Sequence, residues 1–287
     1  VTSTAPRKTE TIPNGVVLNS YMFRTALNDS FAVNELLKHI SENGYRKVVV
    51  IHDNTIYSEA FKELVKNVFP AKVNLLIPDE CNLSGAKTTF NVRDCRDRIR
   101  SENADVLLFI PGTERNKSAK DVVDSNVNSD QALAMLGGDT MYDSISRDSE
   151  YPAKGMVIFV SWHRSSPLNL SKLEKDASDL LSTNQINWRT AMAYDATQAL
   201  IEGLRIAKQQ NCEGIACRRV LRDILAHEGL KSDWGDPTRI VKFDSNGDRE
   251  WNSQGLGVLV KVVSDDPQRN TYKFARCNNS KCDETTQ

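Results

Sequence analysis

Apolar runs of strand length alternate with segments of helical periodicity over the first 160 residues. The first run is "KVVVI" at 47–51, and a helix is predicted before it because Val33, Leu36, Leu37 and Ile40 recur at i, i+3, i+4 and i+7. Such alternation is typical of β-α-β units. We therefore predict an α/β fold with a parallel sheet flanked by helices, whose buried strands are 47–51, 72–77, 105–110, 133–137 and 155–160.

Beyond Trp162 the sequence becomes polar and mostly helical, with helices predicted at 170–181, 188–207 and 218–227. The longest one carries an apolar stripe of Ala193, Ala196, Leu200 and Leu204 that needs a surface to lie on. Farther on, "RIVKF", "DSNGD" and "GVLVKVV" predict two strands around an Asn-Gly turn. The tail from Asp265 is polar, and we expect it to be loosely held except where cysteines fix it.

Charge and hydropathy exclude some kinds of partner. The chain of 287 residues carries 37 basic and 38 acidic side chains, a net charge of -1, so no global field attracts nucleic acid or an anionic membrane. Its longest apolar runs, such as "GMVIFVSW", are far shorter than the roughly 20 residues that cross a bilayer. Partners must therefore be inferred from local sites.

The even number of cysteines predicts disulfides and an oxidising, extracytoplasmic compartment. Six cysteines fall into three pairs that are close in sequence: Cys81 with Cys95, Cys212 with Cys217, and Cys277 with Cys282. Two alternatives stay open. The cysteines are reduced, with Cys95 in the core of a helix, or the two C-x4-C pairs form a zinc site.

Polar residues follow the predicted strands at the points where they end. The sequences there are "HDNTIY", "PGTERN", "GGDTMY" and "SWHRSS". Because ligands of parallel sheets bind beyond the carboxyl ends of the strands, these segments predict a binding site. The alternative is that they are ordinary solvated loops whose polar residues cap helices.

Motifs for catalysis and metal binding are lacking in the sequence. It contains no G-x-S-x-G elbow, phosphate loop or dinucleotide fingerprint, and no H-E-x-x-H spacing. His39 and His227 are expected on helix surfaces, whereas His52 and His163 lie at strand ends. We therefore predict a protein that is not an enzyme and has no cofactor or metal. The enzymatic alternative is an α/β hydrolase, or a receiver domain that takes up phosphate at Asp53.

Eight motifs in order resemble bacterial type I periplasmic solute-binding proteins of the branched-chain amino acid receptor kind. They are "VTSTAP", "YMFRTALNDS", "KVVVIHDNTIYSEAF", "ADVLLFIPG", "LGGDTMY", "GMVIFVSW", "WRTAMAYDATQALIEGL" and "IVKFDSNGDR", and they cover Val1 to about Val263. The resemblance implies a periplasmic binding protein type I-like fold of two lobes. It also implies a receptor that closes on a small ligand in an interlobe cleft for ABC transport or sensing.

The resemblance nominates ligand-binding residues. Thr2, Ser3 and Thr4 match the loop that holds a ligand carboxylate, Tyr57 matches a tyrosine beside the ligand, and Asp139 matches the acidic residue that pairs with its amine. The related receptors generally have glutamate at this last position.

Three further residues are interpreted on the same resemblance. Trp162 is the sixth candidate ligand residue, as a wall of the pocket, with packing between lobes as the alternative. Arg24 is expected to tie the crossing segments together, and Asp195 to favour the start of a helix through the helix dipole.

Domain boundaries also follow from the resemblance. Residues 1–24 match a remnant of lobe 1 and the crossover, 25–161 lobe 2, 162–235 a helical segment of lobe 1, and 236–287 a return to lobe 2 with a β-hairpin and the cysteine-containing tail. The relatives have a long leading segment before the first motif, so lobe 1 is expected to be incomplete. Its uncovered helices would then favour self-association.

The implied partners are a small amino acid-like molecule and an ABC transporter permease or an attached signalling domain, in the periplasm or another extracytoplasmic space. The runner-up interpretation is a sensory or protein-interaction module that keeps the fold without a working small-molecule pocket.

Overall fold

Contacts within the chain divide it into two units. Unit 1 comprises Val1–Asn28 and Ser161–Gly257, and unit 2 comprises Asp29–Val160 and Val258–Gln287. The computed structural model describes residues 22–69, 72–84, 90–148, 151–164, 171–181, 186–234, 239–251, 255–266, 271–278 and 281–282.

Unit 2 is built on one sheet of eight strands in the order β10-β9-β8-β5-β4-β3-β1-β2. The five strands predicted from the sequence are its parallel part: β1 (Lys47–Ile51), β2 (Asn74–Leu76), β3 (Val106–Phe109), β4 (Ala134–Gly137) and β5 (Val157–Val160). Nearly all residues of β1, β3, β4 and β5 are buried, because apolar side chains point to both faces of the sheet. The predicted α/β fold is confirmed.

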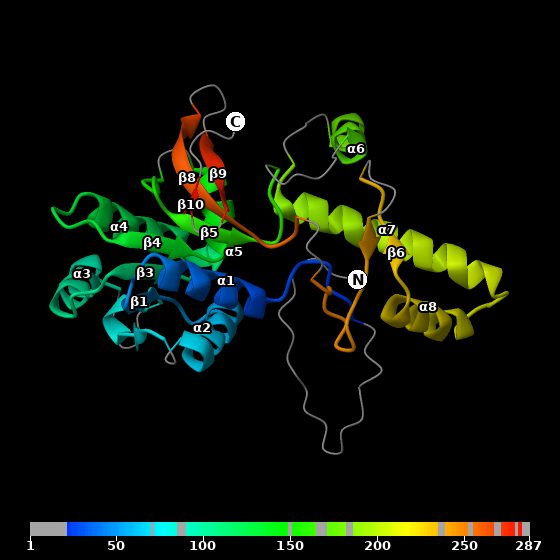
Figure 1. Ribbon diagram of the computed structural model, residues 1–287, viewed down its shortest axis with the longest axis horizontal. Coiled ribbons are helices and arrows are strands. Elements are labelled where there is room, and N and C mark those ends of the chain that lie inside the picture. The colour runs from blue at the N-terminus through cyan, green and yellow to red at the C-terminus, as the bar shows by residue number, and fades with distance from the viewer. Residues whose placement is uncertain are drawn as a thin grey trace, which may run out of the picture. The chain divides into compact units, whose positions relative to one another are not determined.

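Helices cover both faces of this sheet (Figure 1). α1 (Asp29–Glu42) packs on α2 (Ile56–Val68), and α3 (Val92–Ser101) packs on α4 (Asn116–Val127). The connection from β1 to β2 moves across the sheet in one direction, and the connections from β2 to β3 and from β3 to β4 move in the other. Because such crossovers are right-handed, α2 lies on the face opposite α3 and α4. A further helix, α5 (Asp139–Arg147), packs on β4, β5 and β9, and one 3-10 turn lies at η2 (Asp79–Cys81) and another at η3 (Thr113–Arg115).

The C-terminal segment completes the sheet with antiparallel strands. β8 (Val258–Asp266) pairs with β5 and with β9 (Thr271–Asn278), and β10 (Lys281–Cys282) pairs with β9. The expectation of a loosely held tail is therefore wrong for its described residues. The predicted hairpin is also wrong in its partner, because β8 pairs with β9 and not with the segment at 239–243.

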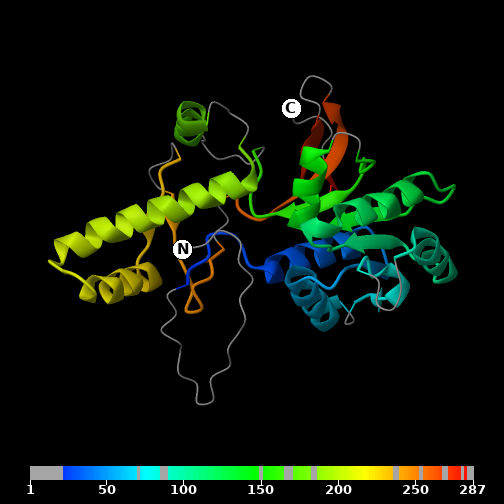
Figure 2. The ribbon, with the colours of Figure 1, turned by 180° about the vertical axis from the view of Figure 1, so that it is seen from behind.

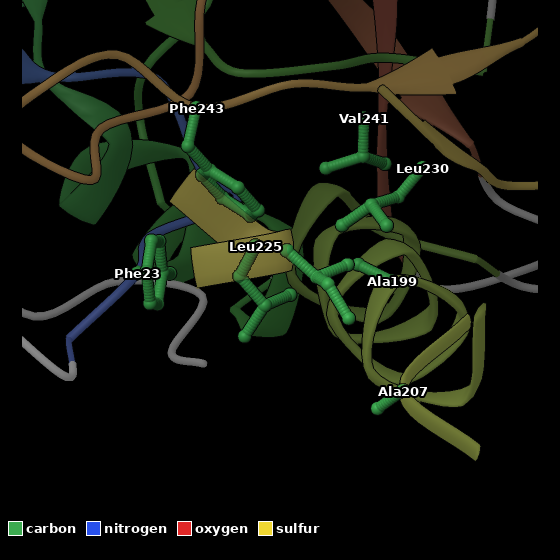
Figure 3. Close-up of a cluster of buried hydrophobic side chains, with 8 residues drawn as sticks. Phe23, Ala199, Ala207, Leu225, Leu230, Val241 and Phe243 are labelled. Carbon is green, nitrogen blue, oxygen red and sulfur yellow. The ribbon is translucent and has the colours of Figure 1, made fainter. Parts of the chain in front are cut away.

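Unit 1 consists of helices on a small sheet (Figure 2). Its helices are α6 (Ser171–Leu181), α7 (Trp188–Gln209) and α8 (Ala216–His227), and β6 (Leu230–Lys231) pairs antiparallel with β7 (Ile240–Val241). The core joins α7, α8, β6 and β7 to Phe23, whose ring lies 5.2 Å from that of Phe243 (Figure 3). α8, β6 and β7 each bury apolar side chains in this cluster, so α7 is covered on one side by elements of its own unit.

The buried stripe of α7 differs from the predicted one. Ala196 is buried as expected, but Ala193 and Leu204 are exposed, as is Ile201. The side that packs inward instead carries Trp188, Ala191, Met192, Asp195, Ala196, Ala199, Gly203 and Ala207. The predicted stripe was wrong because only apolar residues were counted as buried. Asp195 is buried as well, since two arginines neutralise its charge.

Asp195 is the polar centre of unit 1. Its carboxylate accepts hydrogen bonds from Ser232 Oγ at 2.5 Å, Trp234 Nε1 at 2.7 Å, Arg239 Nη2 at 2.9 Å and Arg249 Nη1 at 2.5 Å. Burial alone would raise the pKa of Asp195, but the charges of Arg249 and Arg239 outweigh it and hold the pKa below its ordinary value. Asp195 lies in the second turn of α7, so its predicted role at the start of the helix is wrong.

This cluster also explains where the chain between 239 and 250 belongs. Arg239 and Arg249 reach Asp195, and the turn at 244–248 is tied to Arg24, whose guanidinium lies 2.9 Å from Asp248 Oδ1. The contacts accordingly place residues up to Gly257 in unit 1, whereas the sequence assigned everything from 236 onward to the second lobe.

The cysteines form three disulfides, Cys81–Cys95, Cys212–Cys217 and Cys277–Cys282. The pairing that is closest in sequence is confirmed, and the zinc and reduced alternatives are not. The first bridge joins η2 to α3, the second joins the segment after α7 to the first turn of α8, and the third joins β9 to β10.

None of the helices in the described parts of the chain has the length and apolar character needed to cross a membrane.

Replacing Asp195 should strongly destabilise unit 1. Asp195→Asn keeps the shape of the side chain but leaves two buried guanidinium groups without a counter-charge, which costs about 3–5 kcal/mol of unfolding free energy. All four tryptophans lie in unit 1, so urea unfolding followed by tryptophan fluorescence reports on this unit.

The control is Asp223→Asn, which breaks an exposed contact with Arg222 and should change stability by less than about 1 kcal/mol. Equal, small effects of the two substitutions would contradict a stabilising role for the Asp195 cluster.

Candidate functional site

The carboxyl ends of β1, β3 and β4 lie next to each other in the sheet of unit 2, and the segments that follow them form what we call the carboxyl rim: 52–57, 110–115 and 138–142. Asp53 is fully buried in this rim. One carboxylate oxygen accepts hydrogen bonds from the Thr55 amide at 2.9 Å and its hydroxyl at 2.6 Å, and the other accepts from the Gly112 amide at 2.8 Å. Asp53 thus joins the end of β1 to the end of β3.

Thr55 and Gly112 fit closely together beside Asp53. The Thr55 hydroxyl caps α2 by accepting from the Ser58 amide, and a Cβ on Gly112 would lie 2.7 Å from the Thr55 side chain. The rim continues to β4, because the Thr140 hydroxyl donates to the Pro111 carbonyl at 2.8 Å. Side chains from one strand end therefore hold the next one in place.

Tyr57 and Asp139 are brought together at this rim. Tyr57 is in the first turn of α2 and Asp139 is the first residue of α5. The Tyr57 hydroxyl lies against Gly138, where an added Cβ would approach it to 2.2 Å, so a larger residue here would displace the tyrosine side chain. The ring lies 5.8 Å from that of Phe61, and Tyr57 is half-buried even though its hydroxyl oxygen is fully buried. Part of the residue therefore remains accessible to solvent, while its hydroxyl end does not.

The electrostatic setting of Tyr57 is acidic. Burial, followed by the charges of Asp139 and Asp29, raises the pKa of the Tyr57 hydroxyl well above its ordinary value. Thr140, which also neighbours the hydroxyl, acts in the opposite direction. The hydroxyl is consequently a neutral group at every physiological pH, and the negative charge beside it belongs to the carboxylates.

Asp139 is half-buried and begins α5 directly after Gly138. A carboxylate in the first turn of a helix is stabilised by the helix dipole, so its position has a structural explanation. The same position leaves a half-buried negative charge at the rim, beside the Tyr57 hydroxyl. An aromatic face beside a carboxylate is a suitable environment for an ammonium group.

Trp162 lies in unit 1 and is fully buried. Its ring packs edge-on against Trp234 at 5.4 Å, and the Arg239 guanidinium stacks on the other tryptophan at 3.6 Å. The structure thus places this residue in the tryptophan cluster around Asp195, and its role as a pocket wall stays a prediction. Thr2, Ser3 and Thr4 lie outside the described residues.

Two of the histidines differ from the ordinary surface type. His39 is buried, against the expectation of a helix surface, and burial lowers its pKa. Burial and then the charge of Lys62 lower the pKa of His52, whose two ring nitrogens have no hydrogen-bond partner among the described residues. No described nucleophile is therefore activated by His52. His227 is exposed, as expected.

In the described part of the chain, no three histidine, cysteine or acidic side chains are grouped so that they could hold a metal ion.

Sequence reasoning missed what Asp53 does and missed α5. The apolar run before Asp53 indicated a strand end, but nothing local showed that the carboxylate accepts from Gly112, 59 residues away. "GGDTMY" was interpreted only as a strand end, although Asp139 after a glycine is a recognisable helix start.

Comparison with known proteins gives matches among solved structures alone. No family model matches the sequence, and no curated protein does. An ABC transporter substrate-binding protein from Desulfitobacterium hafniense in complex with Leu superposes with a TM-score of 0.64 at 14% identity, covering 91% of this chain and 68% of that one.

A solute-binding protein of an ABC transporter from R. palustris in complex with benzoate superposes with a TM-score of 0.63 at 15% identity, covering 91% of this chain and 67% of that one. A putative branched-chain amino acid ABC transporter from Rhodospirillum rubrum superposes with a TM-score of 0.60 at 17% identity, covering 85% of this chain and 66% of that one. The fold is therefore that of type I periplasmic solute-binding proteins.

Asp53→Asn should destabilise unit 2 by about 1.5–3 kcal/mol. The NH₂ group of asparagine is a donor and would face either the Thr55 donors or the Gly112 amide. The hydrogen bonds on that side are then lost, and their buried donors are left without an acceptor. The measurement is urea unfolding followed by circular dichroism. Asp97→Asn, on an exposed side chain of α3, is the matched control, and equal stability of the two variants would show that Asp53 does not hold the rim.

The raised pKa of Tyr57 predicts a loss of stability in alkali. The folded state keeps the proton that the unfolded state releases near pH 10, so the stabilisation is complete below pH 10 and is lost as the pH rises towards the folded pKa. Tyr57→Phe removes this dependence. Between pH 8 and pH 11 the stability difference between wild type and variant should shift by about 1.4 kcal/mol in favour of the variant. A pH-independent difference would contradict the burial of this hydroxyl.

Proposed function

We propose that the protein is a non-catalytic solute-binding receptor domain that takes a small zwitterion, such as an amino acid, at the carboxyl rim of unit 2. The observation that carries this proposal is the juxtaposition of the Tyr57 ring and the Asp139 carboxylate at the ends of parallel strands. Ligands of open parallel sheets bind in this place.

Each rim residue would act through a specific group. The ring of Tyr57 would cover the alkyl stem or the ammonium of the ligand, since its hydroxyl is buried against Gly138. Asp139 would balance the positive charge of the ligand. The carboxylate of the ligand requires separate donors, and the hydroxyl groups of Thr2, Ser3 and Thr4 stay the sequence-based candidates for them.

The wider setting supports the same proposal. The folds compared above belong to proteins described as ABC transporter substrate-binding proteins, one with Leu and one with benzoate. We therefore extend the proposal to an ABC transporter permease or an attached signalling domain as the partner. Three disulfides favour an oxidising, extracytoplasmic location.

A phosphate-accepting or hydrolytic enzyme fits the rim poorly. Both carboxylate oxygens of Asp53 already accept hydrogen bonds from the backbone, and the residue is fully buried. A second candidate is a protein-interaction module. Ile201 and Leu204, which are both more than half exposed on α7, would give such a module apolar contact area.

A melting experiment with a panel of amino acids separates these functions. A ligand that binds only the folded protein adds about 2.7 kcal/mol at a hundred times its Kd, so one or more members of the panel should raise the Tm. Asp139→Asn should remove most of this shift, because the ammonium loses its counter-charge. The interaction module predicts no shift for any member of the panel.

The control is Asp121→Asn, an exposed residue of α4 paired with Lys117 in the same unit. It should leave the ligand-induced shift unchanged. If both variants respond to the ligand as the wild type does, the carboxyl rim is not where the ligand binds.

A further inference from the structure

Unit 2 contains a pocket at the edge of the sheet opposite the carboxyl rim. It lies between α3 and the C-terminal half of α4, at the amino ends of β3 and β4. Ile99, Leu107, Val122 and Leu133 form its apolar walls, and the first three of these are buried. Because this pocket and the carboxyl rim lie at opposite strand ends, it is independent of the proposed receptor function.

The mouth of the pocket is positively charged. Arg96 and Arg100 stand four residues apart on α3 and both line the pocket, whereas no acidic residue lines it. Arg96 contacts Asp97 at 3.4 Å in an exposed pair, and an ion pair of this kind is weak and readily exchanged. Among the residues that the structure describes, the Arg100 guanidinium donates a hydrogen bond to Ser129 Oγ alone, at 3.5 Å. Both guanidinium groups are thus available to an anion at the mouth.

The size of the pocket limits the ligand. Its volume is about 90 Å³, less than the ~150 Å³ of an engineered apolar cavity that admits benzene. Its apolar part therefore suits a short alkyl chain rather than an aromatic ring. The walls would bury the chain while two arginines meet a carboxylate, which a guanidinium binds through paired hydrogen bonds.

From these observations we propose that the pocket between α3 and α4 is a second binding site, for a short-chain aliphatic monocarboxylate. The ligand differs from the proposed zwitterion in that it has no ammonium group, and the pocket offers no acidic residue to bind one. Few ligand atoms are buried, so we expect a Kd in the millimolar range.

The test is a titration of methyl-labelled protein with butyrate, followed by NMR. The methyl signals of Ile99, Leu107, Val122 and Leu133 should move together and saturate. Butyramide has the same shape without the charge and should bind about fivefold more weakly. Methyl signals that stay in place at about ten times the expected Kd, or that respond equally to both compounds, would overturn the proposal.

Two sets of variants locate the site. The double substitution Arg96→Gln with Arg100→Gln should raise the Kd for butyrate about fivefold and leave that for butyramide unchanged. Ser125→Leu places a larger side chain in the pocket from α4 and should abolish binding of both compounds. Ser118→Leu makes the same change two helical turns earlier, outside the pocket lining, and should bind as the wild type does.

Loss of binding in Ser118→Leu as well, or unchanged binding in Ser125→Leu, would place the ligand elsewhere. The outcome is separate from the melting experiment with amino acids, because the signals measured here belong to residues that line the pocket and not to the carboxyl rim.

Discussion

The hydrogen bonds of Asp53 are the constraint on which the carboxyl rim depends. A carboxylate buried beside three donors gives up contact with water, and it is stable there only because the Thr55 amide and hydroxyl and the Gly112 amide satisfy it. These bonds fix the start of α2 relative to the end of β3. They thereby fix Tyr57, two residues after Thr55, and the neighbouring contact of Thr140 with Pro111 extends the arrangement to Asp139.

Unit 1 also depends on a buried carboxylate, but its partners there include two positively charged arginines. Asp195 unites α7 with Arg239 and Arg249, which come from separate segments that follow the helices. A buried carboxylate with two guanidinium partners demands close geometry, because removing any partner leaves a buried charge. It therefore accounts for the inclusion of 239–250 in unit 1, which apolar residues alone do not specify.

Prediction from the sequence succeeded where information is local and failed where it is long-range. The runs of β1 and β3 and the periodicity of α1 were sufficient to place these elements, and the short cysteine separations were sufficient for the disulfides. The partner of β8 was not predictable, because "SNGD" looks like a hairpin turn while the pairing is decided by β5 and β9. The burial of Asp195 was missed for a similar reason: its partners lie 44 and 54 residues away. The proximity of Tyr57 and Asp139 was expected from the order of strand ends, but only the structure shows that the hydroxyl is turned inward.

The most direct test of a solute site at the carboxyl rim is the ring signal of Tyr57. The chain has seven tyrosines, so NMR of protein with labelled tyrosine rings, assigned with Tyr57→Phe, resolves this one residue. The account predicts that an amino acid which raises the Tm shifts the Tyr57 ring signal, and that the shift follows the same saturation curve as the stabilisation. A ligand that stabilises the protein while the Tyr57 signal stays unchanged would contradict it.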